Sequence, residues 1–530
     1  GETPAGFGHE LFEDDLERIE ENMMRAIERV PAVGEAGIKR VINGPMIWSP
    51  DSNVLFGPVP ELKNYFCCNG VIPGFSQSGG LGLLAAEWII EGETKYDMFA
   101  WDVARFGAWA SKEFTKSRVG DQYAHRFSIH FPNEERSAGR PVRTRPIYQM
   151  QKEMGAVMGF NYGWEHPLWF AETPGVKDTN GFTRQNWFEP VGKECQMLRE
   201  KAGIIDISNF AKYVVQGKKG RDWLDAVFAN KMPTEVGLSC LTPLISRRGG
   251  LAGDFTVTLI AQDEYWIFGA GMAERYHKRF FDAVPLPEGV SFESRTEPVC
   301  GFNVAGPLSR KILQGLTNTS LNNEDFQFMR SKRADLAGVD VKMLRVSFTG
   351  DLGWEVYCNT ADQKAIYTAL LEAGKEFGAG PVGSRALMAM RVEKGYGSWS
   401  REYSPEYWPH EQGMDRLCKM DKDFLNKAAL QADLAQEPRE QMVTLHLHEA
   451  AVTASNADAT GGEPVFKDGN GIGRVTSGAY GYSVGFSLAL AMVKDVGPGD
   501  EVEVMVLGQP HKAKILHQPP FDPTGKKLRA

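Results

Sequence analysis

The chain has 530 residues, of which 42% are hydrophobic and 24% are charged, and its net charge is −9. This length exceeds what one hydrophobic core supports, so we expect about two to four domains. The negative balance without a long basic run argues against nucleic acid as a partner, and no apolar run reaches the roughly 18 residues of a membrane helix. The seven cysteines are scattered without metal spacing, which indicates a reducing compartment. We expect a cytoplasmic protein, with the mitochondrial matrix as the alternative.

The N-terminal hundred residues alternate between helical patterns and punctuated turns. Glu10 to Val30 has helical periodicity, and Ile38 to Ile42 reads as a short strand. Asn43 to Asp51 is a turn marked by Gly and Pro. Gly70 to Ile89 then passes from a glycine-rich loop into a helix rich in Leu and Ala. Such a loop exposes backbone N–H groups to a ligand at a helix N-terminus, although a close-packed turn would need the same glycines.

The middle of the chain begins with a polar connection and continues, from Met154 to about Pro438, as alternating short strands and helices. Asp254 stands where a β-rich run leaves a glycine-rich turn. Gly269 and Gly271 follow a strand and precede a helix, which imitates a dinucleotide-binding loop. The third glycine of that loop is replaced by Glu274, so nicotinamide binding is not expected.

A stretch from Leu344 to Tyr357 predicts two short strands around a tight turn. It places Glu355 between Trp354 and Val356, so this carboxylate either has a ligand or lies on an edge strand that faces water. The segments after it predict helices over 365–377 and 385–394. From Gln441 onward, strands separated by turn signals predict a small terminal β-barrel or sandwich.

Two carboxylates are the strongest chemical candidates. Asp254 and Glu355 both lie among aromatic and β-branched residues, and a carboxylate pair in a dry pocket suits a ligand that carries amine or ring N–H groups. Two unrelated carboxylates on solvated strand edges are the alternative. No His spacing indicates a catalytic metal, and no Ser or Cys lies in a nucleophile elbow.

Several blocks of sequence resemble the folate-binding domain of the glycine-cleavage aminomethyltransferase, the T-protein. The resemblance covers Met154 to about Lys427 and is carried by Ile204–Lys212, Phe302–Leu313, Leu344–Tyr357, Arg391–Gly395 and Pro409–Met414. Arg474 to Ser483 is similar to the small C-terminal barrel of the same family. The N-terminal hundred residues resemble the end of the flavoprotein domain of D-amino-acid and sarcosine oxidases.

A flavin domain followed by a T-protein domain is the arrangement of the dimethylglycine and sarcosine dehydrogenase family. The resemblance implies an α+β chain with four parts: the end of an FAD-dependent oxidoreductase domain (1–100), a connecting segment (101–153), a T-protein-like folate domain (154–438) and a β-barrel (439–530). The family's dinucleotide-binding motif is not in this sequence. We therefore expect the chain to be the C-terminal portion of such an enzyme, partnered by an N-terminal flavin half or chain, and able to form a homo-oligomer.

The resemblance also assigns residues to the folate site. Asp254 matches the aspartate that contacts the pterin or its reactive amine, and Glu355 matches the glutamate that accepts hydrogen bonds from the pterin. Phe348 stands where dimethylglycine dehydrogenases have Tyr, and Gly269 stands where the T-protein has a pterin-contacting Asn. Phe210 completes the expected folate-binding residues. Leu387 replaces an Arg that the T-protein uses for its lipoyl-borne substrate.

On the flavin side, one loop matches the segment under the flavin pyrimidine edge, and its residues are Ile72, Pro73, Gly74, Phe75 and Ser76. Met46 lies where related oxidases place a residue over the substrate. Gly44 stands where monomeric sarcosine oxidases have the cysteine that holds their flavin.

The function that the resemblance implies is oxidative demethylation of a small N-methylated amino acid, of the dimethylglycine or sarcosine type, with FAD and tetrahydrofolate. The one-carbon unit would leave as 5,10-methylene-tetrahydrofolate, with Asp254 as the catalytic group. The alternatives are a flavin-independent, folate-dependent methyltransferase or demethylase of the T-protein family, and a non-catalytic assembly subunit.

Overall fold

The computed structural model describes residues 6–8 and 10–530. Residues 1–5 and 9, which belong to the predicted first domain, lie outside the described residues. Short 3-10 helices occur at several connections, namely η1 (Glu17–Ile19), η2 (Val103–Arg105), η3 (Gly271–Ala273), η4 (Thr360–Asp362), η5 (Pro409–Gln412) and η6 (Asp415–Leu417).

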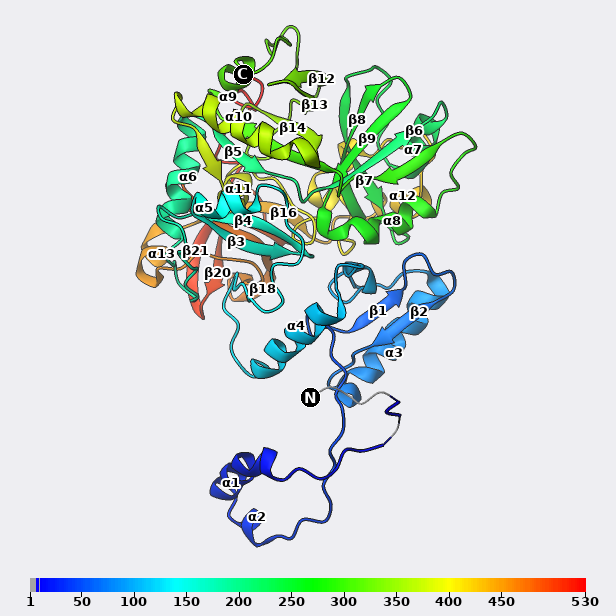
Figure 1. Cartoon of the computed structure of the whole chain (residues 1–530), viewed down its shortest axis with the longest axis vertical. Helices are drawn as coiled ribbons and strands as arrows, with labels where there is room; N and C mark the ends of the chain where they lie inside the picture. Colours follow the sequence, from blue (N-terminus) through cyan, green and yellow to red (C-terminus); the bar gives the residue numbers. More distant parts are fainter. Residues whose placement is uncertain (1–5, 9) are drawn as a thin grey trace.

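The N-terminal region holds a two-stranded sheet and a few helices, and it lies below the main body in Figure 1. Its elements are α1 (Glu20–Arg29), α2 (Ala32–Glu35), β1 (Leu55–Pro58), β2 (Phe66–Asn69), α3 (Gly74–Glu91) and α4 (Lys112–Ala124). The helix predicted from Glu10 begins as an α-helix only at Glu20, and the strand predicted over 38–42 is irregular backbone. Neither α1 nor α2 buries a residue, so no sheet or core stabilises extended backbone there.

Ion pairs tie this region to the main body. Arg248 donates to Glu87 at 2.8 Å and to Glu91 at 2.6 Å, both on α3. Arg279 forms a bidentate pair with the fully buried Asp102. A buried carboxylate held by two N–H donors fixes orientation as well as charge, so α3 is positioned against the main body.

The main body contains two sheets. The first is antiparallel, in the order β10 (Ser291–Ser294), β6 (Ala211–Gln216), β9 (Glu264–Gly269), β8 (Leu251–Ala261) and β7 (Ser239–Ile245). The second has the order β12 (Ser331–Leu336), β13 (Val339–Leu344), β14 (Gly353–Asn359), β11 (Val299–Ala305), β5 (Gly203–Asp206) and β15 (Gly380–Val382). Only the β5–β15 pair is parallel within the described part of this sheet.

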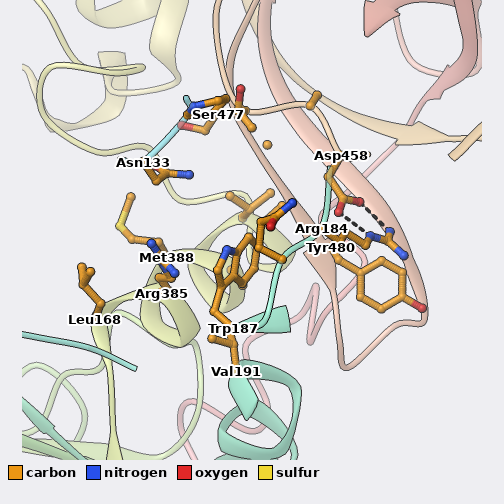
Figure 2. A pocket seen from close by; sticks show the side chains of 18 of the residues that line it. Asn133, Leu168, Arg184, Trp187, Val191, Arg385, Met388, Asp458, Ser477 and Tyr480 are labelled. Carbon is orange, nitrogen blue, oxygen red and sulfur yellow. Dashed lines mark hydrogen bonds and ion pairs between the residues drawn. The ribbon is translucent and has the colours of Figure 1, made fainter. Parts of the chain in front are cut away.

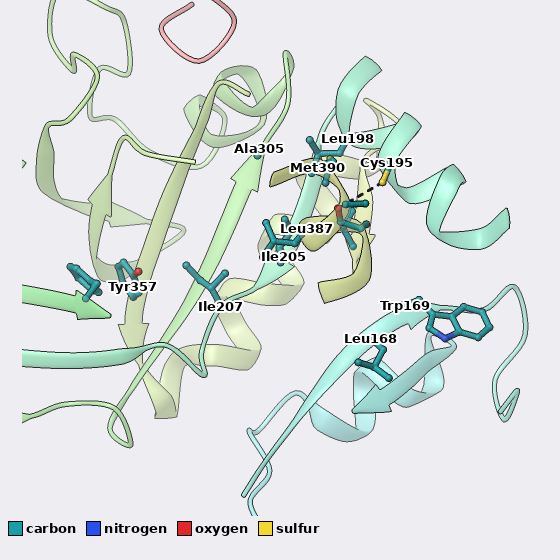
Figure 3. Close-up of a cluster of buried hydrophobic side chains, with 14 of the residues drawn as sticks. Leu168, Trp169, Cys195, Leu198, Ile205, Ile207, Ala305, Tyr357, Leu387 and Met390 are labelled. Atoms are coloured by element: carbon teal, nitrogen blue, oxygen red, sulfur yellow. Dashed lines mark hydrogen bonds between the residues drawn. The ribbon is translucent and has the colours of Figure 1, made fainter. Parts of the chain in front are cut away.

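Helices and a hairpin accompany the sheets. They are α5 (Tyr148–Glu153), β3 (Ala156–Asn161), β4 (Trp164–Phe170), α6 (Phe188–Glu200), α7 (Gly220–Val227), α8 (Glu274–Asp282), α9 (Ser309–Gln314), α10 (Gln363–Lys375), α11 (Ser384–Glu393) and α12 (Lys427–Leu434). A central apolar cluster, drawn in Figure 3, joins α6 and α11 to strands of both sheets. A fully buried large side chain such as Trp169 stabilises this cluster by about 2–3 kcal/mol.

The C-terminal module is a closed barrel, which decides between the two architectures that its strand pattern allowed. Its strand order is β16 (Gln441–Leu447), β19 (Phe486–Val493), β18 (Asn470–Gly481), β17 (Pro464–Lys467), β20 (Glu501–Val506) and β21 (Gln509–Ile515), with α13 (Glu449–Ser455) after the first strand. Closure leaves no free sheet edge in these strands. The barrel packs on α11 mainly through β18.

The stretch from Leu344 to Tyr357 forms one strand rather than the predicted two. β13 ends at Leu344, and the backbone around Val346 and Phe348 is irregular until β14 begins. The turn has a physical cause: Thr349 accepts the backbone N–H of Asp351, and Asp351 forms an ion pair with Arg199 of α6. These side-chain contacts compete with strand pairing and override the local β propensity.

Candidate functional site

Asp254 lies on β8, and the register of the sheet defines its neighbours. Thr256 on β8 and Lys212 on β6 are both directly opposite Phe268 on β9. Residues that are paired, or two apart on one strand, share a face of a sheet. Asp254 and Lys212 therefore lie on the same face as Phe268.

Glu355 lies on β14, an interior strand that pairs with β11 and β13, so it is not on an edge strand. Tyr357, two residues on and hence on the same face, donates its hydroxyl hydrogen to Glu355 Oε2 at 2.7 Å. The Tyr357 ring stacks on Phe268, with 4.4 Å between the ring centroids. This contact joins the face that carries Glu355 to the face that carries Asp254.

Lys212 lies on β6 opposite Phe268 and is fully buried. Its Nζ donates to the carbonyl oxygens of Ser208 and Phe210, at 2.9 and 2.7 Å. Burial, together with the nearby Arg145, lowers the pKa of Lys212 to about 7. The ammonium group fixes the turn that carries Phe210 and attracts Glu355.

The two carboxylates are short of charge-stabilising donors. Burial raises the pKa of Asp254 to about 6, and only its own backbone N–H opposes this. Burial also raises the pKa of Glu355 to about 7, although Tyr357 and Lys212 act in the other direction. Both groups therefore exchange protons near neutral pH, and an N–H donor from a ligand would stabilise either as a carboxylate.

The remaining predicted folate residues differ in how they are placed. Phe210 and Phe348 are half-buried and pack against the central cluster that contains Tyr357. Phe348 also stacks on Tyr396, with 6.0 Å between centroids and 18° between planes. Gly269 is different, because a Cβ there would lie 2.6 Å from the ring of Phe255. Only the backbone of Gly269 is available to a ligand. The Phe255 ring occupies the space that the side chain of the T-protein's Asn would need at this position.

The predicted flavin-side residues lie in the N-terminal region. Ile72 and Pro73 precede α3, which begins at Gly74, and no side chain caps that helix start in the described chain. Phe75 is fully exposed, and Met46 is 48% exposed in the segment before β1. The backbone N–H groups at the start of α3 thus remain open to an acceptor.

Two further findings concern metal ligands and membrane spans. Within residues 6–8 and 10–530, no group of three or more His, Cys, Asp or Glu side chains could hold a metal ion. No helix in the same range combines the length and apolarity needed to cross a bilayer.

Sequence reasoning missed three members of the site, namely Lys212, Tyr357 and Phe268. The alternation of β14 was a usable signal for Tyr357, because a residue two positions from Glu355 shares its face. The other two lie on different strands, and only the pairing of β6 with β9 brings them together.

Comparison with known proteins supports the resemblance. The family model described as the GCVT N-terminal domain matches residues 147–422. Two further models match, the FAD dependent oxidoreductase central domain over residues 91–144 and the glycine cleavage T-protein C-terminal barrel domain over residues 441–522. The predicted α+β class, with part of an FAD oxidoreductase domain, a T-protein fold and a barrel, is confirmed. The predicted domain boundaries stay a prediction.

Curated relatives match along nearly the whole chain. Mitochondrial dimethylglycine dehydrogenase of Mus musculus is 34% identical over 529 residues, which cover 98% of this chain and 60% of the relative. Mitochondrial sarcosine dehydrogenase of the same species is 28% identical over 585 residues, covering 100% of this chain and 63% of the relative. The chain thus spans about 60% of the length of these relatives. The predicted resemblance to the dimethylglycine and sarcosine dehydrogenase family is confirmed.

A solved structure supports the fold. The aminomethyltransferase T of the glycine cleavage system from Bartonella henselae superposes with a TM-score of 0.62 at 21% identity, covering 72% of this chain and 98% of that chain.

The prediction of a cytoplasmic location is wrong. The dimethylglycine and sarcosine dehydrogenases that match are mitochondrial proteins, and this finding contradicts the cytoplasmic prediction. Scattered cysteines indicate a reducing environment, and that property does not distinguish the two compartments.

Proposed function

The chain belongs to the family of the GCVT N-terminal domain, and on that premise we propose that it forms the folate-binding part of an oxidative demethylase. The substrate class is a small N-methylated amino acid, of the dimethylglycine or sarcosine type. A bound FAD would supply the acceptor for a hydride from the N-methyl group, and a bound tetrahydrofolate would supply the acceptor for the one-carbon unit, which would leave as 5,10-methylene-tetrahydrofolate.

The observation that carries the proposal is a shortage of hydrogen-bond donors at two carboxylates, which lie on the two sheet faces that the contact between Phe268 and Tyr357 joins. Asp254 accepts no side-chain hydrogen bond within the described chain, and Glu355 accepts only one, from Tyr357. A pterin offers an amino group and ring N–H groups, which are the donors that such carboxylates need. The residues present therefore fit a folate.

The residues have separate roles in this proposal. Glu355, oriented by Tyr357, accepts hydrogen bonds from the pterin and positions it. Asp254, whose pKa is raised to about 6 by burial, takes up and returns the proton of the reacting folate nitrogen near neutral pH. The half-buried rings of Phe210 and Phe348 exclude water beside the pterin and offer flat surfaces for packing.

The N-terminal region fits a flavin in a limited way. The first-turn N–H groups of α3, from Gly74 to Ser76, have no side-chain cap within residues 6–8 and 10–530. They would donate to the pyrimidine edge of the flavin, and the helix dipole would favour negative charge there. Since this region alone has no dinucleotide-binding motif, we propose that a flavin-binding partner segment or chain completes the site.

The test separates folate binding from flavin chemistry. Equilibrium binding of 5-formyl-tetrahydrofolate is measured for the wild type, for Glu355→Gln and for a control, Glu503→Gln, which alters an exposed strand residue. We expect Glu355→Gln to weaken binding about tenfold or more, since a charge-assisted acceptor is lost. The control should bind as the wild type does. Unchanged binding by Glu355→Gln would contradict the folate site.

A second measurement addresses the reaction. In protein purified with its flavin, dimethylglycine or sarcosine should still bleach the flavin absorption in Glu355→Gln, while formation of 5,10-methylene-tetrahydrofolate falls. A wild-type preparation that contains no flavin but transfers one-carbon units to folate would instead favour the flavin-independent T-protein alternative.

A further inference from the structure

A cavity whose lining includes neither Asp254 nor Glu355 lies between α11, the loop before α6 and the barrel. Its volume is about 270 Å³. In Figure 2, Trp187 and Met388 lie on one side of the hollow, and Ser477 and Asp458 lie on the other. The walls thus come from two domains, which is a common setting for a ligand site.

Four arginines line this cavity, and three of them form ion pairs. The pairs are Arg184 with Asp458 at 2.7 Å, Arg385 with Asp178 at 2.6 Å, and Arg391 with Glu402 at 2.7 Å. The fourth is Arg401, an exposed residue that forms no ion pair with a carboxylate within 4.0 Å in the described part of the chain. Glu135 also lines the cavity and is 3.3 Å from Arg140. The lining therefore carries one positive charge without a partner.

Arg391 provides a second, independent observation. It is 1% exposed, and its Nη atoms donate to Glu402, Ser477 and the carbonyl of Tyr396. Its Nε has no acceptor among the described residues. This Nε is sealed from the cavity as well as from solvent, so Arg391 acts on the lining through its buried positive charge beside Arg401.

The surroundings of Arg401 disfavour its positive charge. Partial desolvation and the neighbouring Arg391 both lower the pKa of Arg401, and solvent screens part of this effect because the residue is exposed. Glu402 acts in the other direction, although it is already paired with Arg391. An anion placed beside both guanidinium groups would relieve this repulsion.

The rest of the lining is suited to a flat apolar body. Trp187 is half-buried, and Arg385 holds its guanidinium 5.0 Å above the Trp187 ring. Met388 and Tyr480 also line the hollow. A ring can pack against these side chains while a charged group reaches Arg401.

We propose that this cavity binds a carboxylate-bearing ligand with an aromatic or apolar body, and that the ligand's carboxylate pairs with Arg401. The body packs against Trp187, Met388 and Tyr480. Two sources have this chemistry, a separate small carboxylate and the acidic tail of a folate bound at the carboxylate pair. The site itself does not rest on the proposed function.

Calorimetric titration of the full chain with benzoate and with its neutral isostere benzamide tests the site. We expect benzoate to bind at least about tenfold more tightly than benzamide, because the carboxylate pairs with a guanidinium. Arg401→Gln should remove this preference, and Arg401→Lys should keep part of it. The matched control is Arg333→Gln, which alters a half-exposed arginine on β12, and it should bind as the wild type does. Thermal unfolding verifies that each variant is folded.

Equal binding of benzoate and benzamide, or unchanged benzoate binding by Arg401→Gln, would overturn the proposal and indicate that only water fills the cavity. Titration with benzoate after saturation with 5-formyl-tetrahydrofolate separates the two sources. Loss of benzoate binding identifies the folate tail as the occupant, and unchanged binding identifies a separate carboxylate. Because benzoate is used without folate in the first titration, failure of the folate proposal leaves that result interpretable.

Discussion

Replacing Asp254 by Asn should make the ligand-free protein more stable and the enzyme less active. The substitution removes a carboxylate that burial holds at a pKa of about 6, against 3.8 ordinarily. At about 1.4 kcal/mol per pKa unit, the ionised group costs the folded state about 3 kcal/mol at most. The side chain is partly exposed, and solvent screening reduces the expected gain to about 1–2 kcal/mol.

The extra stability of the Asp254→Asn protein should increase with pH. Because the folded-state pKa is raised, the folded protein binds more protons than the unfolded chain between the two pKa values. Its stability therefore falls as the pH rises from about 4 through about 6, and then levels off. Asp254→Asn removes this fall, so its advantage should be full at about pH 8 and nearly absent at about pH 4.

Urea unfolding at the two pH values measures the effect, with Asp222→Asn as the control, since the Asp222 side chain is 73% exposed. The control should change stability by less than about 0.5 kcal/mol at either pH. An Asp254→Asn protein that is less stable than the wild type at the higher pH would refute the reasoning, because it would mean that a donor already satisfies the carboxylate. The same variant should lose folate-dependent turnover, which would make Asp254 a case of function kept at the expense of stability.

Three further substitutions probe the site and its supports. Tyr357→Phe removes the hydroxyl that orients Glu355 and should weaken the binding of 5-formyl-tetrahydrofolate by about 1–2 kcal/mol, measured by titration. Equal affinity would mean that the hydroxyl has no orienting role. Gly269→Asn forces a Cβ to within 2.6 Å of the Phe255 ring and should lower the free energy of unfolding, measured in urea, by about 1–3 kcal/mol. An unchanged free energy of unfolding would show that the ring moves freely. Glu402→Gln leaves the buried Arg391 without its carboxylate and should lower the free energy of unfolding by about 3–5 kcal/mol, which is measured as a lower unfolding temperature. A temperature shift no larger than that of an exposed Glu→Gln variant would contradict this prediction.

Sequence reasoning found those site residues whose role can be inferred from their neighbours along the chain. Glu355 stood out because a carboxylate interrupts an apolar run, and β14 is indeed an interior strand. Val346 and Phe348 carried the same β propensity, yet their segment is irregular, because Asp351 reaches Arg199 on a helix about 150 residues away in sequence. A contact of that range is invisible to local pattern and can override it.

Lys212 illustrates the converse limit. It lay inside a motif block that suggested the family, but nothing in its neighbours indicated a buried ammonium beside a carboxylate. The pairing of β6 with β9 places it opposite Phe268, and the contact of Phe268 with Tyr357 then joins the two sheets. The charge environment of Glu355 is thus set by strand pairing and by one aromatic contact between sheets. Residues that strand pairing brings to a site can shift the pKa of its groups without appearing in any short motif. Lys212→Met tests this, because it would remove the attraction that lowers the pKa of Glu355.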